Sequence, residues 1–373
     1  MKKISSSLKI ILAQTLLLTA FSLFINNLYG QNLNPNKVFY PPYQSESRDN
    51  IIFPKVGDYI VLTADLHTHT VFSDGLVWPT QRVYEARQGG LDILSITDHI
   101  EYRPHKEYLN SDHNTPYNIA KPFAQEHGIT LIKGTEITKT QRTHGHFNAL
   151  FIDDANLLEE ADPKIAIQKA RESGAFIIWN HPGWAVDTTK INDFHKNLLE
   201  ERLIDGIEVF NNIEFYPRVL SWAIDYNLTI IATTDVHGYV EKSTLQNNGV
   251  DRPMTLILSK DRSIESIRDA LDKGRTLAYF NNIIAAKESL ANEFVNYNIS
   301  LKELSSNNKN KFIEITNKGS VPYILKIDNK RVTLPKLSSI ILTIPNTSSR
   351  TLNVVFENIF TYENRFLAHD LQY

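Results

Sequence analysis

The sequence predicts an α/β fold, a distorted seven-stranded barrel followed by a small antiparallel β domain. Two observations support this prediction. Short apolar runs alternate with helical patterns between residues 58 and 285, and the composition becomes rich in Asn turns after about Ala286. Strands that alternate with helices indicate a parallel sheet, and seven repeats of this size favour closure into a barrel.

The barrel strands are predicted from short apolar runs, each suited to a buried strand. They cover residues 60–66, 92–97, 130–134, 147–152, 175–179, 206–209 and 229–233. Helical patterns separate most of them, at residues 79–88, 163–172, 192–202, 217–226 and 263–273. The connection at residues 139–145, between the third and fourth strands, has no room for a helix, so we expect an irregular barrel.

The C-terminal region, residues 286–373, shows alternating patterns instead. They lie at residues 312–316, 323–327, 331–334, 339–344 and 352–356. Asp328 and Asn329 separate two of these runs and suit a hairpin turn. We expect a sandwich-like β domain without chemistry of its own, since no ionisable residues cluster here.

The N-terminus predicts export. Residues 1–30 begin with three lysines and an apolar stretch of residues 10–23, which is shorter than the roughly 20 residues that a bilayer requires. We interpret residues 1–30 as a signal peptide, with no membrane span after cleavage, and residues 31–57 as an extended lead-in. A retained anchor is the alternative. Either interpretation predicts a periplasmic or secreted protein.

Composition narrows the classes of function. The chain has no cysteine, which excludes disulfides and thiol catalysis. Without the three lysines of residues 1–30, 36 basic residues face 42 acidic ones, a formal charge of −6. This balance disfavours nonspecific binding to nucleic acid or anionic membranes, so no nucleic-acid partner is indicated. The oligomeric state is left open.

Histidines and carboxylates follow the predicted strands. In a barrel, the carboxyl ends of the strands open onto one rim, so distant residues converge there. Imidazole with carboxylate suits zinc, manganese or iron, and the absence of thiolates favours a catalytic site. Each residue alone has a simpler explanation, such as a helix cap or an exposed pair of histidines. Together, these residues predict a multinuclear metal site. The candidates are His67, His69, Asp74, His99, Glu136, His146, His181, Asp235 and His237.

These residues lie in motifs that resemble the PHP (polymerase and histidinol phosphatase) superfamily of metal-dependent phosphoesterases. The motifs, in order, are ADLHTHTVFSDG, SITDH, GTEIT, GHFN, WNHPGW and TTDVHG, within residues 58–285. The resemblance implies a distorted seven-stranded (βα)7 PHP barrel. The signal peptide and the β tail further resemble the secreted Sphingobium-type phosphodiesterase branch.

The resemblance also implies the ligand sets of two or three divalent metal ions. One ion would be held by His67, His69, Glu136 and Asp235. Glu136 would bridge to a second ion held by His146 and His181. A third ion would take Asp74, His99 and His237, although many trinuclear members have a histidine at the position of Asp74. His144 competes with His146, which better matches the motif.

We therefore expect an exported metal-dependent phosphoesterase that cleaves diesters in preference to monoesters. A metal-bridging hydroxide would be the nucleophile, with Glu136, Asp235 and His99 as catalytic residues. The third ion, or protonated Asp98 or His99 in its absence, could assist the leaving group. Three alternatives are a phosphomonoesterase, a metal-dependent hydrolase of an amide or lactone, and a non-catalytic binding module.

Loop residues after the strands are candidates for contact with a small phosphate ester substrate, because arginine offers a bidentate fork and other polar groups offer single bonds. For each, a surface charge is the simpler explanation. Trp179 and Trp184 would form an apolar wall or pack the barrel. The candidates for substrate contact are Arg103, Lys139, Arg142 and Asn211, with Tyr239 and Lys242 beside them.

Overall fold

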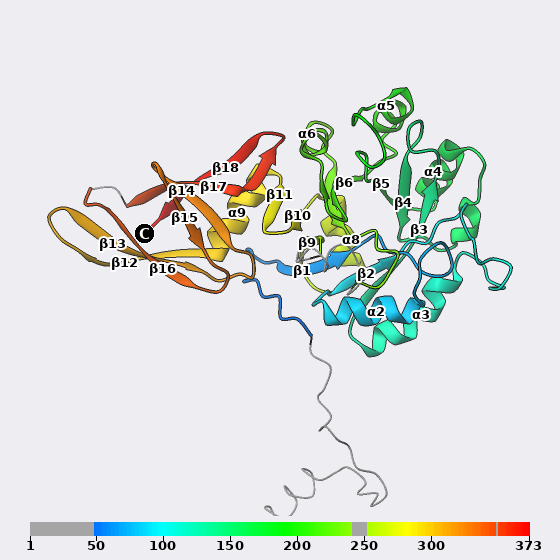
Figure 1. The fold of residues 1–373 in the computed structure, drawn as a ribbon, viewed down its shortest axis with the longest axis horizontal. Helices are drawn as coiled ribbons and strands as arrows, with labels where there is room; N and C mark the ends of the chain where they lie inside the picture. The colour runs from blue at the N-terminus through cyan, green and yellow to red at the C-terminus, as the bar shows by residue number, and fades with distance from the viewer. Residues whose placement is uncertain (1–47, 241–251, 348–349) are drawn as a thin grey trace, which may run out of the picture. The chain divides into compact units, whose positions relative to one another are not determined.

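The computed structural model describes residues 48–240, 252–347 and 350–373, and residues 48–373 form one compact unit (Figure 1). The predicted signal peptide, most of the lead-in and Lys242 lie outside the described residues. Within the described part of the chain, no helix is long and apolar enough to cross a bilayer.

All seven predicted strands are present. They are β1 (Ile60–Asp65), β2 (Ile93–Ile96), β3 (Thr130–Thr138), β4 (His146–Leu150), β5 (Phe176–Asn180), β6 (Gly206–Asn211) and β8 (Thr229–Thr233). The sheet runs β1-β2-β3-β4-β5-β6, with β8 and the short β7 (Glu214–Phe215) both paired to β6. β4 is antiparallel to both β3 and β5, as the short third connection requires.

Three consecutive strands that follow β8 along the chain were not predicted, and neither was the short β7. β9 (Met254–Ser259) pairs antiparallel with β1, and β10 (Thr276–Phe280) follows it, with β11 (Ile283–Ala286) beyond. Among the described residues no backbone ladder joins β8 to β9. Instead, the Thr255 hydroxyl donates to the Ala232 carbonyl and accepts from the Ala232 amide. The result is an α/β fold built on a large mixed sheet.

The five predicted helices are α2 (Pro79–Gln88), α4 (Pro163–Glu172), α5 (Asp193–Glu200), α6 (Pro217–Asp225) and α8 (Ile264–Asp272). Asp162, Asn192 and Ser263 cap α4, α5 and α8 by accepting from backbone amides. The sequence pattern missed α3 (Thr115–Glu126), α9 (Glu288–Asn298) and a 3-10 helix, η1 (Ala155–Leu158).

The C-terminal strands lie in two sheets. One sheet contains β12 (Ile299–Ser306), β13 (Asn310–Asn317) and β16 (Ser339–Pro345). The other strands, β14 (Tyr323–Ile327), β15 (Lys330–Leu334), β17 (Thr351–Tyr362) and β18 (Arg365–Gln372), continue the large sheet, because β17 pairs in parallel with β11 (Figure 1). The region expected to be a separate domain is therefore joined to the preceding strands by backbone hydrogen bonds.

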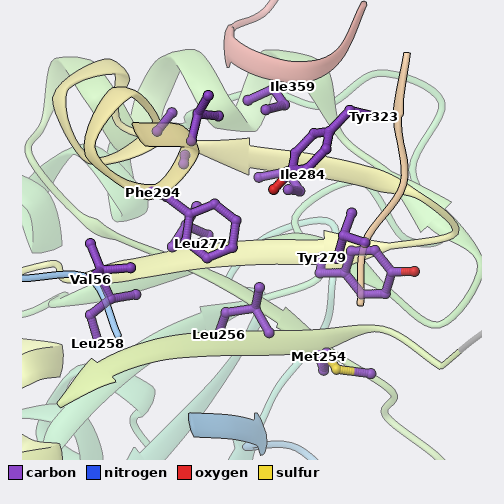
Figure 2. Packing of buried hydrophobic residues seen from close by; sticks show 14 of the residues in the cluster. Val56, Met254, Leu256, Leu258, Leu277, Tyr279, Ile284, Phe294, Tyr323 and Ile359 are labelled. Carbon is purple, nitrogen blue, oxygen red and sulfur yellow. The ribbon is translucent and has the colours of Figure 1, made fainter. Parts of the chain in front are cut away.

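A shared core accompanies this joined sheet. Leu256 of β9 and Leu277 of β10 pack in one cluster with Phe294 of α9, Tyr323 of β14 and Ile359 of β17 (Figure 2). All five side chains are buried. Burial on this scale is the main favourable term in folding, so it holds the C-terminal strands to the sheet that carries the predicted site.

Candidate metal centre

The structure gathers the nine predicted metal ligands at the carboxyl ends of the central strands. His67, His69 and Asp74 follow β1, His99 follows β2, and Glu136 lies in β3. His146 begins the antiparallel β4, so its first residue also lies at this rim. His181 follows β5, and Asp235 and His237 follow β8. The donor atoms of all but His146 form three overlapping groups, within each of which the atoms lie within 4.8 Å of one another. His146 contacts Glu136 of the second group.

The first group joins the histidine pair to Asp235. Oδ1 of Asp235 lies 3.2 Å from Nε2 of His67 and 3.0 Å from Nε2 of His69. Both imidazole nitrogens are also 3.5 Å from Oε2 of Glu136. The four side chains expected around one metal ion therefore meet at one point.

Glu136 stands at the centre of the second group and has no exposed surface. Its Oε1 lies 3.1 Å from Nδ1 of His146 and 3.6 Å from Nε2 of His181. Its Oε2 lies 2.7 Å from Nδ1 of His99. One carboxylate thus faces imidazoles from several strands, which is the position a bridging ligand requires.

The third group is built around Asp74. Its Oδ1 lies 3.1 Å from Nε2 of His237 and 3.4 Å from Nε2 of His99. The ring of His69 is within 4.4 Å of the His99 ring and 4.2 Å of the His237 ring, measured between centroids. The structure therefore adds His69 to the three residues expected here.

Two of the nine residues adopt backbone conformations that side chains disfavour. His181 has φ of 28° and Asp235 has φ of 51°. Such conformations cost free energy and persist where the surrounding structure enforces them, which is common at functional sites. Glycine is also required at position 75 for steric reasons, because a Cβ there would lie 2.6 Å from the backbone carbon of His69.

Glu208 is a site residue that the sequence analysis missed. It is fully buried in β6, and its Oε1 accepts from Nδ1 of His67 at 2.8 Å. Its Oε2 accepts from the His181 amide at 2.7 Å. The bond to Nδ1 fixes the tautomer of His67 and leaves Nε2 facing the cluster as a donor. A single acid within an apolar strand offers no sequence signal for this role.

Arg82 of α2 ties the two ligand-bearing loops together. The side chain is 1% exposed, and it donates to the carbonyls of His69, Val236, His237 and Gly238 over 2.7–3.0 Å. It also pairs with Glu85 at 2.6 Å. Because one guanidinium satisfies carbonyls on both loops, it holds the loop after β1 against the loop after β8.

Asp98 faces away from the cluster. Its carboxylate accepts hydrogen bonds from the Thr70 amide and hydroxyl at 2.6 Å and from the Ser73 hydroxyl at 2.7 Å. Burial raises its pKa, although these donors oppose the shift. The carboxylate orders the loop that carries Asp74, and its geometry does not favour the leaving-group role considered from the sequence.

The pKa values of the imidazoles in the cluster are shifted in opposite directions. Burial alone would lower the pKa of His67 and of His99, but carboxylates outweigh it and leave the pKa of His67 well above its ordinary value and that of His99 at about 9. The pKa of His69 is lowered to about 3, first by burial and then by repulsion from His99 and His237. The carboxylates therefore favour positive charge in the cluster, but the buried imidazoles cannot all be protonated at once.

Divalent cations fit this donor set. Oε2 of Glu136 and Oδ1 of Asp74 are buried, and neither accepts a well-aligned hydrogen bond within the described residues. Both oxygens face imidazole nitrogens instead. Buried charge is costly unless it is paired or coordinated, and a cation bound between oxygen and nitrogen lone pairs satisfies both.

The expected substrate contacts are largely engaged elsewhere. Arg103 donates to the Ser111 carbonyl and hydroxyl, and Lys139 pairs with Glu101 at 2.7 Å. Asn211 is buried and its amide donates to Glu208, so it supports the site from within. Arg142 is exposed and lines a cavity together with Trp179 and His195.

The two tryptophans take different positions. Trp179 is buried against His195, whereas Trp184 is 47% exposed and its ring lies 5.3 Å from the His181 ring. His144 turns its Nδ1 to the Thr143 hydroxyl, whereas His146 faces Glu136. The geometry thus favours His146 over His144 as a member of the cluster.

A model of the PHP domain family matches residues 65–331. This chain belongs to the PHP domain family. The PHP chain is also similar to a solved two-domain protein from Bacteroides vulgatus that contains a predicted PHP-like metal-dependent phosphoesterase. The two are 37% identical, the match covers 88% of this chain and 100% of that one, and the TM-score is 0.84.

Curated relatives match shorter parts of the PHP chain. An uncharacterized protein of Methanocaldococcus jannaschii is 31% identical over 119 residues, 31% of this chain and 44% of its own length. A 5'-3' exoribonuclease of Haemophilus influenzae is 33% identical over 81 residues, 22% of this chain and 25% of its own length. The match thus spans less than half of either relative.

Proposed function

We propose that this PHP chain hydrolyses phosphodiesters in preference to phosphomonoesters, using two or three divalent ions. The enzyme class itself is that of metal-dependent phosphoric ester hydrolases, to which the family and the similar Bacteroides structure point. The observation that carries the proposal is the set of three overlapping histidine and carboxylate groups around the buried Glu136.

The proposed ligand assignment starts from these groups and adds the contacts of Glu136 with His69 and His146. His67, His69, Asp235 and Glu136 hold one ion, and Glu136 with His146 and His181 holds a second. Asp74, His99 and His237, with His69 beside them, hold a third. Zinc, manganese and iron all accept this mixture of nitrogen and oxygen donors.

Bound ions would supply positive charge to the phosphoryl oxygens and make an attacking water more acidic. The chain's own residues prepare the site. Glu208 keeps a proton on Nδ1 of His67, so that Nε2 faces the cluster. Arg82 holds the loop after β1 against the loop after β8. These contacts fix the geometry before a substrate arrives, which lowers the reorganisation needed for reaction.

The preference for diesters rests on charge. A diester carries one negative charge, whereas a monoester carries up to two near neutral pH and calls for more cationic groups. Of the three cationic candidates for substrate contact, Lys139 and Arg103 are bound to Glu101 and Ser111, and Arg142 lines a cavity formed with Trp179 and His195. With the exoribonuclease among its relatives, nucleotide diesters are one class that the test should include.

The test combines metal analysis with a substrate panel. We expect purified protein to contain divalent metal by mass spectrometry and to cleave bis(4-nitrophenyl) phosphate faster than 4-nitrophenyl phosphate. Short RNA and DNA oligonucleotides, a lactone and an amide complete the panel. Glu136→Gln should remove activity on every substrate. Cleavage of the lactone or amide alone would replace the proposal with the non-phosphate alternative, and metal binding without any cleavage would favour a binding module.

We also propose that the chain is exported and belongs with secreted phosphodiesterases of the Sphingobium type. The basis for export is the charged and apolar pattern of residues 1–30. The basis for the Sphingobium-type branch is this pattern together with the β tail of residues 286–373. Cell fractionation and sequencing of the mature N-terminus test this. A mature protein that begins near residue 31 outside the cytoplasm is expected, and a cytoplasmic full-length chain contradicts export.

A further inference from the structure

Trp184 is an exposed aromatic residue beside two of the proposed metal ligands. Its ring lies 5.3 Å from the His181 ring and 5.8 Å from the His146 ring, measured between centroids. Both imidazoles are buried, whereas Trp184 is 47% exposed. A large apolar ring is thus left in contact with water at the edge of the metal centre, where a bound ligand would cover it favourably.

The turn that carries Trp184 is tied to the ligand His181. The Trp184 amide donates to the His181 carbonyl at 3.0 Å, and Nε2 of Gln141 donates to the same carbonyl at 3.0 Å. Gly183 packs against Tyr216, because a Cβ on the glycine would lie 2.5 Å from the Tyr216 ring. The backbone of Trp184 is therefore held in place before a ligand binds, which reduces the entropy lost on binding.

The indole of Trp184 is not stacked on either imidazole. Its plane is inclined by 71° to the His181 ring and by 58° to the His146 ring. These are its aromatic contacts within the part of the chain that the structure describes. Aromatic rings also bind planar groups by offset stacking. At least one face of the indole has no ring stacked on it, so its exposed part can take a planar group from a ligand.

Tyr102 takes a similar position beside another proposed ligand. It is 53% exposed, and its ring lies 6.4 Å from the His99 ring. Tyr102 follows β2 and Trp184 follows β5, and the strand order β2-β3-β4-β5 places Glu136 and His146 between these two loops. Exposed aromatic rings therefore lie at two loops that flank the centre. A diester carries two ester groups on one phosphorus, so a phosphoryl group at the centre brings both of them over the surrounding residues.

We infer that Trp184 selects diesters in which an ester group carries a planar ring, by stacking on that ring while the phosphoryl group lies at the metal centre. Tyr102 offers a second ring for the other ester group. This specificity rests on the proposed function. An aryl group and a nucleobase share the chemistry, since each has the flat π face on which stacking depends.

Binding is measured without catalysis by using phosphinates, which have no ester bond to cleave. Diphenylphosphinate and dimethylphosphinate are titrated into zinc-loaded protein, with affinities from calorimetry. We expect the diphenyl compound to bind roughly tenfold more tightly and to shift the indole N–H resonance of Trp184, which is identified by its absence in Trp184→Phe.

Variants assign this preference for the diphenyl compound to the ring. Trp184→Ala should remove most of it, Trp184→Phe should restore part of it, and Tyr102→Ala should reduce it. Tyr226→Ala is the matched control, because Tyr226 is 45% exposed and lies between α6 and β8, where the chain enters the amino end of a strand. The control should keep the full preference. The same ratio of the two affinities in Trp184→Ala as in the unmodified protein overturns the inference.

Kinetics with one leaving group distinguish an aryl group from a nucleobase. The substrates are the methyl, phenyl and thymidine 5′ diesters of 4-nitrophenyl phosphate. Trp184→Ala should raise KM roughly tenfold for the diesters whose ring it binds, with kcat little changed, because stacking stabilises substrate and transition state alike. A rise for the phenyl diester alone assigns an aryl group, a rise for the thymidine diester alone assigns a nucleobase, and an equal rise for all three assigns the leaving 4-nitrophenyl ring.

The two proposals fail separately. If no diester is cleaved but the preference for diphenylphosphinate still depends on Trp184, the phosphodiesterase proposal falls and the ring-binding site stands. If diesters are cleaved and Trp184→Ala alters neither the phosphinate ratio nor any KM, the proposed function stands and the role of Trp184 falls.

Discussion

Nδ1 of His67 donates to Oε1 of Glu208 across 2.8 Å, and neither side chain has any exposed surface. A carboxylate in this position orients a metal-binding imidazole and strengthens it as a donor. We expect Glu208→Gln to weaken metal binding by about 10–100-fold, measured by chelator competition. Glu126→Gln, on the exposed surface of α3, is the matched control. An unchanged metal affinity in Glu208→Gln would contradict this role.

Arg82→Met should destabilise the protein by about 3–5 kcal/mol, since it leaves Glu85 buried without its cationic partner and removes one donor from each of four backbone carbonyls. Urea unfolding measures the loss. Arg87→Met, in the same helix, removes a part-buried bond to one carbonyl and should cost far less. Equal losses in the two variants would show that the contacts between loops add nothing.

Gly75→Ala should reduce both stability and metal content. An added Cβ would lie 2.6 Å from the backbone of His69 and Thr70, so the loop carrying Asp74 would have to move. Gly238→Ala lies in the other ligand loop, where a Cβ meets nothing within 4 Å. Thermal unfolding and bound metal are measured for both, and we expect Gly238→Ala to resemble the unmodified protein. Full metal content in Gly75→Ala would refute the prediction.

The metal-free protein should lose stability as pH rises from about 6.5 to about 9. The pKa of His99 is raised to about 9 from an ordinary value of 6.5, because Glu136 and Asp74 outweigh burial. A raised pKa stabilises the folded state fully below the unfolded value, and this contribution is lost as pH rises through the folded value.

Chelator-treated and metal-loaded protein are compared by thermal unfolding across this range. A bound cation replaces the protons on the imidazoles, so metal-loaded protein should show a smaller decline. Parallel curves for the two forms would argue against metal in the cluster.

Substitutions at two positions of the shared core should affect the free energy of unfolding differently. Phe294→Ala should cost about 3–5 kcal/mol, because Phe294 is fully buried between α9 and the large sheet (Figure 2). Tyr323→Phe should be neutral or slightly stabilising, since the Tyr323 hydroxyl is buried without a hydrogen-bond partner in the described residues. Urea unfolding measures both, and a loss above about 1 kcal/mol in Tyr323→Phe would indicate that the hydroxyl is bound.

Sequence patterns located the elements around the site closely. Each of the seven predicted strands and five predicted helices is present, because apolar periodicity and capping residues are local signals. β9, β10 and β11 were missed, although each is buried. Such short apolar runs resemble any other buried segment, and their pairing depends on partners distant in sequence, such as β1 and β17.

The histidines and carboxylates of the centre were recognisable from the sequence by residue type, order and position after strands, since parallel strands must open onto one rim. Tertiary structure alone showed that Glu208, Arg82 and Asn211 support the cluster and that His69 lies in two of its groups. The tertiary structure also showed that C-terminal strands pair with the large sheet. These relationships rest on hydrogen bonds and packing between residues far apart in the chain, where periodicity carries no information.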